Sequence, residues 1–460
     1  MIRLPAGALL PWPGLFAMMV ERAHSGAERR GRVTVGLSIS DVVVVADDLS
    51  GAAESAAALA RFGHGPVPVL LDGTVPEASS LFLGPVVIDT NSRALAPEEA
   101  ADACAGVRRS LEQRLRQGRR TVVVKKIDSL LRGNIAAEIP ALSGQGALRL
   151  LAPALPSAGR IVRDGEVWVD GRPLAEMPAW RLESHDAPRA VSKTISSRAC
   201  RVFTLPEVRT GPTAADVAAV DLAVFDGETA DDVASAARFG FSLEGEVLLI
   251  GSAALVEAVA ALADVESAAR EGRGPRTPAR ATERPRRLLF VVGSAEPSAS
   301  RQVDALERAG VAVVRAEPRE LLASADAVSR AVQDALAGSY AVAVTTTGGH
   351  VGADDRARLV QSLATAVSVA TDSGRADTAF LATGGQTARA LLDSWGTRIL
   401  HVAGGDPSGV AWGTTDDGVQ VLTRPGSFGA DDDLVRVLRA VREMTADPSR
   451  TGERNDDDRT

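Results

Sequence analysis

Short runs of β-branched apolar residues alternate along this chain with longer stretches rich in Ala, Leu and Arg. Strands followed by helices in this rhythm are typical of parallel βαβ units. In the first part of the chain the predicted strands are 41–47, 85–90, 121–127, 222–227 and 246–252. A second series has predicted strands at 287–294, 340–349, 379–385, 398–405 and 419–427. The pattern predicts an α/β protein of two doubly wound domains, with mostly parallel sheets facing an interdomain cleft.

A segment rich in Pro, Gly and Arg separates the two series. It reads SAAREGRGPRTPARATERPRR over residues 267–287 and has no apolar periodicity, which indicates a linker or an exposed excursion. A chain of 460 residues also exceeds what one hydrophobic core usually organises. We therefore predict two domains, over 38–266 and 288–445, with a disordered extension over 1–37 and a disordered tail over 446–460.

Composition and charge exclude several classes of partner. The net charge is −8, without the basic face that a nucleic acid requires. Cys104 and Cys200 have no CxxC spacing, so neither a disulfide framework nor a thiolate zinc site is indicated. The apolar segment 4–20 is interrupted by prolines and is shorter than the roughly 20 residues that span a bilayer. We expect a cytoplasmic protein with a small-molecule partner and no nucleic acid or membrane, and a homodimer stays open.

Two adjacent acids, Asp47 and Asp48, follow the run VVVVA directly. Ligands of doubly wound sheets bind beyond the carboxyl ends of the strands, where helix N-termini offer free N–H groups. One carboxylate of such a pair can hold a divalent cation while the other accepts a substrate proton. The alternative is that one of them caps a helix or stabilises a turn.

The stretch KKIDSLLRGN, residues 125–134, places two lysines, an acid and an arginine at the end of another strand. Lysines directly after a buried strand are costly unless an anion meets them. That anion is either a protein partner such as Asp47 or the carboxylate or phosphate of a ligand. A structural salt bridge is the alternative to a binding role.

Glycine-rich turns follow several strands of the second series, among them TGGQTARA at 383–390 and RPGSFG at 424–429. Small residues let backbone N–H groups approach phosphate oxygens, although such turns are also common without a ligand. The P-loop, dinucleotide, protein-kinase and α/β-hydrolase motifs are missing from the sequence. The histidines are widely separated, so no protein-bound metal is predicted beyond magnesium carried by a nucleotide.

These motifs together resemble a known family. VVVADDLSGAAE, VVIDTNSRAL, KKIDSLLRGNIAAEI and LAPALPSAGRIVRDGEVWVDGRPLAE resemble the N-terminal domain of the four-carbon acid sugar kinases. VVGSAEPSASRQ, ATGGQTARALL and VLTRPGSFG resemble the nucleotide-binding C-terminal domain of that family. The resemblance implies ATP-dependent phosphoryl transfer, with Mg²⁺, to a hydroxyl of a small sugar acid such as threonate, erythronate or 3-oxo-tetronate. The terminal hydroxyl is the expected acceptor.

The resemblance also implies roles for individual residues. Asp47 or Asp48 is the expected base, Arg132 and a lysine are expected to clamp the substrate carboxylate or the phosphoryl group, and Asp128 is expected to orient them. The expected catalytic residues are Asp47, Asp48, Lys126, Asp128 and Arg132. The expected substrate-binding residues are Ser50, Arg93, Lys125, Gly133 and Asn134. The expected nucleotide-binding residues are Ser294, Gly384, Gly385, Gln386, Thr387 and Gly426.

Some positions depart from the family pattern. Ala53, Glu54 and Leu130 replace residues that flank the expected acid pocket, and Gln386 replaces a commonly acidic residue. Glutamine still forms hydrogen bonds but does not hold a cation as a carboxylate does. The sequence therefore leaves one alternative from another class, a sugar-acid or nucleotide sensor that keeps the fold without turnover.

Overall fold

The computed structural model forms two compact units, which are described separately. The larger unit comprises described residues within 32–281 and 382–425, and the smaller unit those within 282–381 and 426–460. The described residues are 42–62, 65–73, 84–116, 121–177, 180, 186–271, 285–293, 297–347, 353–406, 408–426 and 430–445. The predicted extension over 1–37, the tail over 446–460 and most of the predicted linker lie outside them.

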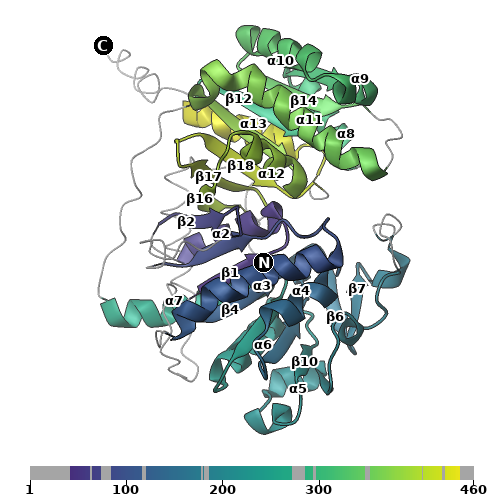
Figure 1. Ribbon diagram of the computed structural model, residues 1–460, viewed down its shortest axis with the longest axis vertical. Helices are drawn as coiled ribbons and strands as arrows, with labels where there is room; N and C mark the ends of the chain where they lie inside the picture. The colour runs from purple at the N-terminus through teal and green to yellow at the C-terminus, as the bar shows by residue number, and fades with distance from the viewer. Residues whose placement is uncertain are drawn as a thin grey trace, which may run out of the picture. The chain divides into compact units, whose positions relative to one another are not determined.

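A mostly parallel sheet organises the larger unit (Figure 1). Its strands, in spatial order, are β18 (Gln420–Arg424), β17 (Ala411–Thr415), β16 (Ile399–Gly405), β2 (Val67–Leu70), β3 (Val86–Asp89), β1 (Val42–Ala46), β4 (Val122–Lys126), β11 (Val247–Gly251), β5 (Leu148–Ala152), β10 (Leu222–Phe225) and β9 (Cys200–Phe203). All neighbours from β2 to β9 are parallel. The predicted fold class is confirmed in this unit.

Strand β1 lies between two parallel neighbours, in which Val44 pairs with Val87 of β3 and with Val124 of β4. All five residues of β1 are buried, as expected for a parallel strand covered on both faces. Since β3, β1 and β4 are parallel neighbours, the segments that follow them begin at one edge of the sheet. This edge brings together the segments 47–48, 89–93 and 126–134.

Strands β16, β17 and β18 extend the sheet by antiparallel pairing. β16 pairs with β2, with Leu400 opposite Val69, and β17 lies between β16 and β18. This pairing groups residues 382–425 with the larger unit, although the sequence places them in the span 288–445. The domain limits predicted from the sequence therefore stay predictions. Helix α7 (Ala253–Glu271) continues into the segment predicted as a linker.

Helix α2 is almost entirely buried and contacts α7, α12 and β16. Its Gly and Ala residues permit this close packing: a Cβ on Gly405 of β16 would lie 2.8 Å from Cβ of Ala57. Helices α3 and α4 lie side by side (Figure 1). The helices of this unit are α2 (Leu49–Phe62), α3 (Pro97–Arg116), α4 (Ile135–Leu142), α5 (Leu205–Thr210), α6 (Ala230–Ser242), α7 and α12 (Gly385–Ser394), with short turns η3 (Pro156–Ala158), η4 (Leu174–Glu176), η6 (Val191–Lys193) and η7 (Ala214–Val217).

A small antiparallel sheet, β6 (Arg160–Arg163), β7 (Glu166–Val169) and β8 (Arg172–Pro173), belongs to the same unit. The buried carboxylate of Asp226 accepts hydrogen bonds from the β6–β7 turn, at 2.7 Å from the N–H of Asp164 and 2.8 Å from that of Gly165. The indole of Trp180 donates to the carbonyl of Leu130 at 2.9 Å. Together with Arg160, which donates to Ser129, this indole contact fixes the loop after β4.

In the smaller unit the strand order is β13 (Ala312–Ala316), β14 (Ala341–Thr346), β12 (Arg287–Val292) and β15 (Thr378–Thr383), whose last two residues are grouped with the larger unit. β14 is parallel to both β13 and β12. Its helices are α8 (Pro297–Arg308), α9 (Pro318–Ala323), α10 (Asp326–Gly338), α11 (Ala353–Thr371) and α13 (Asp433–Thr445), with the short turn η8 (Asp372–Asp377). Helices α10 and α11 pack against each other (Figure 1). The predicted cleft between domains stays a prediction.

Candidate active site

The two acids after β1 have different surroundings. Asp48 is the N-cap of α2, because its Oδ1 accepts a hydrogen bond from the N–H of Gly51 at 2.9 Å. Its side chain keeps 14% exposure, whereas that of Asp47 keeps 2%. The helix-cap alternative thus applies to Asp48, which nevertheless is the more accessible acid.

Arg93 joins both acids in one ion-pair cluster. Its Nε lies 2.7 Å from Oδ2 of Asp47 and its Nη2 lies 2.8 Å from Oδ1. Its Nη1 lies 2.8 Å from Oδ2 of Asp48. Burial alone raises the pKa of Asp47, but Arg93, with Lys125 and Lys126, holds that pKa below its ordinary value. Asp47 is therefore a charged anchor with both oxygens engaged by Arg93.

The turn that carries Arg93 is held by the second motif. Asn134 donates through its side-chain amide to the carbonyls of Ser92 and Leu95, each at 2.9 Å. Gly133 has φ of 90°, and a Cβ there would lie 3.1 Å from Oδ2 of Asp47. The sequence needs glycine at this position because a side chain would be strained there and would crowd the acid.

Lys125 is fully buried and forms an ion pair with Glu138 of α4, with 3.1 Å between Nζ and Oε2. Burial alone lowers the pKa of Lys125, but Glu138, Cys104 and Asp47 together raise it. Ser92 donates a hydrogen bond to the other oxygen of Glu138. Lys125 therefore forms the salt bridge that the sequence left as an alternative, and its predicted contact with the substrate stays a prediction.

Lys126 points toward the first turn of α2. Its Nζ lies 3.5 Å from Oε2 of Glu54 and donates to the carbonyl of Ile127 at 3.3 Å. A Cβ on Gly51 would lie 3.2 Å from that Nζ and 2.9 Å from Oδ1 of Asp48. Lys126 and Asp48 therefore flank the same glycine. Burial raises the pKa of Glu54, and Lys126 opposes that shift.

Asp128 and Arg132 form a further pair at the edge of this cluster, with Nε of Arg132 at 2.6 Å from Oδ2 of Asp128. Burial raises the pKa of Asp128, but Arg93, Arg132 and Arg160 together lower it well below its ordinary value. Asp128 thus pairs with Arg132, and the orienting and catalytic roles expected of Asp128 stay predictions.

The GGQT turn begins α12 and lies against the acid cluster. A Cβ on Gly385 would lie 2.6 Å from Oδ2 of Asp48 and 3.1 Å from the backbone N of Ser50. Gly384 has φ of 87° and donates its N–H to the carbonyl of Arg424 at 2.8 Å. The N-termini of two helices, α2 and α12, therefore meet around Asp48.

Two buried hydroxyls flank this junction without a hydrogen-bond partner among the described residues. They are Oγ of Ser50, in the first turn of α2, and Oγ1 of Thr383, which directly precedes the Gly-Gly turn. Both side chains belong to residues more than nine-tenths buried. Unpartnered buried hydroxyls are costly, and a bound ligand that offers oxygen atoms would satisfy them.

Comparison with known proteins decides the family. A model of a sugar-binding N-terminal domain matches residues 42–259, and a model of a nucleotide-binding C-terminal domain matches residues 289–434. The chain is 32% identical over 432 residues to a D-threonate kinase of Cupriavidus necator, covering 88% of this chain and 99% of that protein. The chain belongs to the four-carbon acid sugar kinase family. It is a sugar-acid kinase, as the sequence motifs predict.

Other relatives agree with this assignment. A D-threonate kinase of Bordetella bronchiseptica is 30% identical over 429 residues, which cover 87% of this chain and 97% of that protein. A crystallised Salmonella typhimurium LT2 protein, named as a candidate tRNA synthase, superposes with a TM-score of 0.65 at 21% identity, covering 87% of this kinase and 99% of that chain. A Haemophilus influenzae protein gives a TM-score of 0.62 at 18% identity, covering 88% and 100%. The last two show the fold alone.

The kinase brings most predicted site residues together within the larger unit. Gln386 is exposed on α12 and Thr387 is buried behind it. Ser294 lies outside the described residues, and Gly426 lies in the smaller unit. The roles of all the predicted site residues, Ser294 and Gly426 included, stay predictions.

Sequence reasoning did not assign three further residues of the cluster: Asp89, Glu138 and Arg389. Glu138 had one signal, since it is an isolated acid within the apolar helix IAAEIPAL. Asp89 and Arg389 pair across 300 residues of sequence, and no local pattern relates them.

No group of three His, Cys, Asp or Glu side chains suited to a metal ion occurs in the described part of the kinase. In the same residues, no helix combines the length and apolar character needed to cross a membrane. A cytoplasmic location, a homodimer and the absence of nucleic acid stay predictions.

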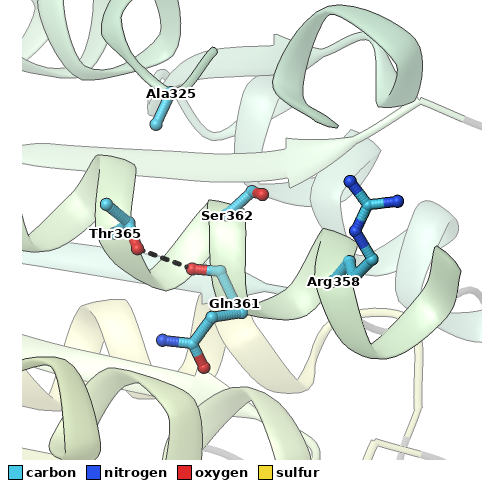
Figure 2. A pocket seen from close by; sticks show the side chains of 5 residues that line it. All are labelled: Ala325, Arg358, Gln361, Ser362 and Thr365. Atoms are coloured by element: carbon cyan, nitrogen blue, oxygen red, sulfur yellow. Dashed lines mark hydrogen bonds between the residues drawn. The ribbon is translucent and has the colours of Figure 1, made fainter. Parts of the chain in front are cut away.

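A cavity of about 290 Å³ lies in the smaller unit. Figure 2 shows its lining side chains, Ala325, Arg358, Gln361, Ser362 and Thr365. Arg358 pairs with Asp355 at 2.9 Å, and the Thr365 hydroxyl donates to the carbonyl of Gln361. None of the predicted site residues lines it. A cavity of about 70 Å³ in the larger unit lies beside Glu54 and Arg61.

Proposed function

We propose that this kinase transfers the γ-phosphoryl group of ATP to a hydroxyl, the terminal one, of a four-carbon acid sugar such as threonate, erythronate or 3-oxo-tetronate. The observation that carries the proposal is the junction of Asp48, Ser50 and Gly385. It sets an accessible carboxylate beside two helix N-termini, and helix N-termini favour phosphate groups. Phosphoryl transfer requires this combination of a group that orients the nucleophile and donors for developing charge.

Each residue has one role in this proposal. Asp48 orients the acceptor hydroxyl and takes its proton as the oxygen attacks the γ-phosphorus and the bond from that phosphorus to the ADP oxygen breaks. Asp47 anchors Arg93. Lys126 and Arg132 are the cations for the substrate carboxylate and the transferring phosphoryl group.

The nucleotide side is assigned to the first turn of α12. Its N–H groups, with the hydroxyls of Ser50 and Thr383, are suited to phosphate oxygens, since those hydroxyls have no protein partner among the described residues. Magnesium bound with the nucleotide would neutralise charge on the phosphates. The larger unit holds this turn and the acid side together.

An ADP-release assay of the purified protein tests the proposal. ATP and Mg²⁺ are supplied with a panel of tetronates, 3-oxo acids and longer aldonates. We expect turnover with at least one four-carbon acid and none without an acceptor. Clear nucleotide binding with no turnover on any acid would contradict the proposal in favour of the sensor alternative.

Replacing Gly385 by Ala tests the junction itself. The new Cβ would meet the Asp48 carboxylate, which Arg93 and the N–H of Gly51 hold in place. Helix α12 must then shift, and we expect kcat/KM for ATP to fall roughly 10- to 100-fold, because small misplacements of reacting groups are costly. Gly338→Ala is the control, since its Cβ would meet nothing within 4 Å. Equal activity of both variants would contradict the assigned junction.

A further inference from the structure

Asp89, the last residue of β3, is a fully buried acid that the proposed chemistry does not use. Its Oδ1 accepts a hydrogen bond from the N–H of Asn91 at 3.0 Å. Its Oδ2 accepts one from Nη1 of Arg389 at 3.0 Å. One carboxylate thus connects the segment after β3 with helix α12.

The hydrogen bond between Asp89 and Arg389 connects Asp89 to the helix that begins with the GGQT turn. Arg389 is the fifth residue of α12, which begins at Gly385, and its side chain is 13% exposed. Its Nε also binds Asp393 of the same helix at 2.8 Å, outside the buried contact. This ion pair therefore connects α12 to Asp89 at the end of β3.

The hydrogen bond between Asp89 and the N–H of Asn91 connects Asp89 to the segment that carries Arg93. Asn91 has φ of 48°, a left-handed conformation that asparagine tolerates. Arg93 follows two residues later, donates its backbone N–H to the carbonyl of Asp47 at 3.1 Å and clamps Asp48. Asp48 also faces Gly385. Asp89 is therefore connected to the junction by two routes, one through Arg389 and α12 and the other through Asn91 and Arg93.

We propose that Asp89 and Arg389 are positioning residues that hold the GGQT turn in register with Asp48 and so set the affinity for the nucleotide. A buried ion pair is often no more stabilising than an apolar pair. We therefore explain the Asp89–Arg389 pair by its effect on the position of α12 rather than by its effect on stability. This inference rests on the proposed function, because it assigns the nucleotide to the turn at Gly385.

Calorimetric titration with Mg·ATP tests this inference in wild type, Arg389→Gln, Asp89→Asn and the double variant. We expect the Kd to rise roughly 5- to 20-fold in each single variant and to rise little further in the double variant, because residues of one network couple. The KM for the sugar acid should change less than twofold in Arg389→Gln. Asp393→Asn is the matched control, since it removes the exposed partner of the same guanidinium, and its Kd should stay within twofold of wild type.

Two further measurements separate positioning from stability alone. Arg389→Lys, which keeps the charge and the fold, should recover part of the affinity. Burial raises the pKa of Asp89 to about 6, against the opposing effect of Arg389 and Asn91, with Asp48 adding to the rise. Protonation of Asp89 below that pH removes its charge, so wild-type affinity relative to Asp89→Asn should decline from pH 7.5 to pH 5.

The outcomes distinguish the two proposals. A wild-type protein that does not bind Mg·ATP contradicts the proposed function and this inference with it. Wild-type binding with an unchanged Kd in Arg389→Gln and Asp89→Asn, whatever their thermal stability, contradicts this inference alone. A wild-type to Asp89→Asn affinity ratio that is constant between pH 5 and pH 7.5 also contradicts it.

Discussion

Replacing Asp48 by Asn is expected to lower kcat by roughly 10²- to 10⁴-fold, the usual contribution of a positioned general base. Asparagine is as good an N-cap as aspartate, so the bond from Gly51 and the start of α2 should persist. The amide cannot take the proton of the acceptor hydroxyl. Single-turnover phosphoryl transfer at saturating ATP and acid measures the chemical step, and circular dichroism verifies the fold.

Asp47→Asn is the matched control for this assignment. Both oxygens of Asp47 bind Arg93, so the substitution should weaken the hold on that arginine, which keeps its bond to Asp48, and raise the KM for the sugar acid more than it lowers kcat. The opposite pattern, with Asp48→Asn active and Asp47→Asn inactive at saturating substrate, would move the base to Asp47.

Replacing Glu138 by Gln is expected to destabilise the folded protein by about 3–5 kcal/mol, the usual cost of leaving one member of a buried ion pair alone. Lys125 and Glu138 are 0% and 1% exposed. The amide cannot neutralise the ammonium, whose pKa Glu138 helps to raise. Urea unfolding followed by fluorescence measures the loss.

The double variant Lys125→Met, Glu138→Leu should recover most of this stability, because an apolar pair replaces a buried ionic one at little cost. Asp355→Asn is the control, since its exposed pair with Arg358 is worth less than about 1 kcal/mol. A loss below about 1 kcal/mol in Glu138→Gln would show that Lys125 has another counter-ion, and would support its predicted contact with the substrate.

The parallel part of the fold could be predicted from sequence because each strand carries its own signal. The runs VVVVA, VVID and VVVKK are mostly buried and begin with β-branched residues, and each occurs as a strand that ends at the same edge of one sheet. The acids and cations that follow these runs therefore meet, whatever the details of the helices between them.

The antiparallel extension could not be predicted in the same way. The sequence RILHVAGG, which forms β16, contains no signal that identifies the strand it pairs with. Its partner is β2, the short strand VPVL, which sequence reasoning did not identify. An unpaired edge at β2 would expose backbone groups, so the pairing is favourable, but its partner lies over 300 residues away. The Asp89–Arg389 contact escaped prediction for the same reason.

Individual roles within the cluster also depend on packing that sequence does not reveal. Lys125 and Lys126 are neighbours, yet alternation along β4 points one toward Glu138 and the other toward Glu54. Asp47 and Asp48 differ in the same way, one engaged twice by Arg93 and the other at a helix cap.

A crystal structure of the kinase with a nonhydrolysable ATP analogue, Mg²⁺ and a four-carbon acid tests the central claim most directly. We predict the acceptor oxygen within about 3 Å of the Asp48 carboxylate and about 3–3.5 Å from the γ-phosphorus, with the phosphates at the first turn of α12. An acceptor hydroxyl bound away from Asp48, or a triphosphate bound away from Gly385, would contradict it.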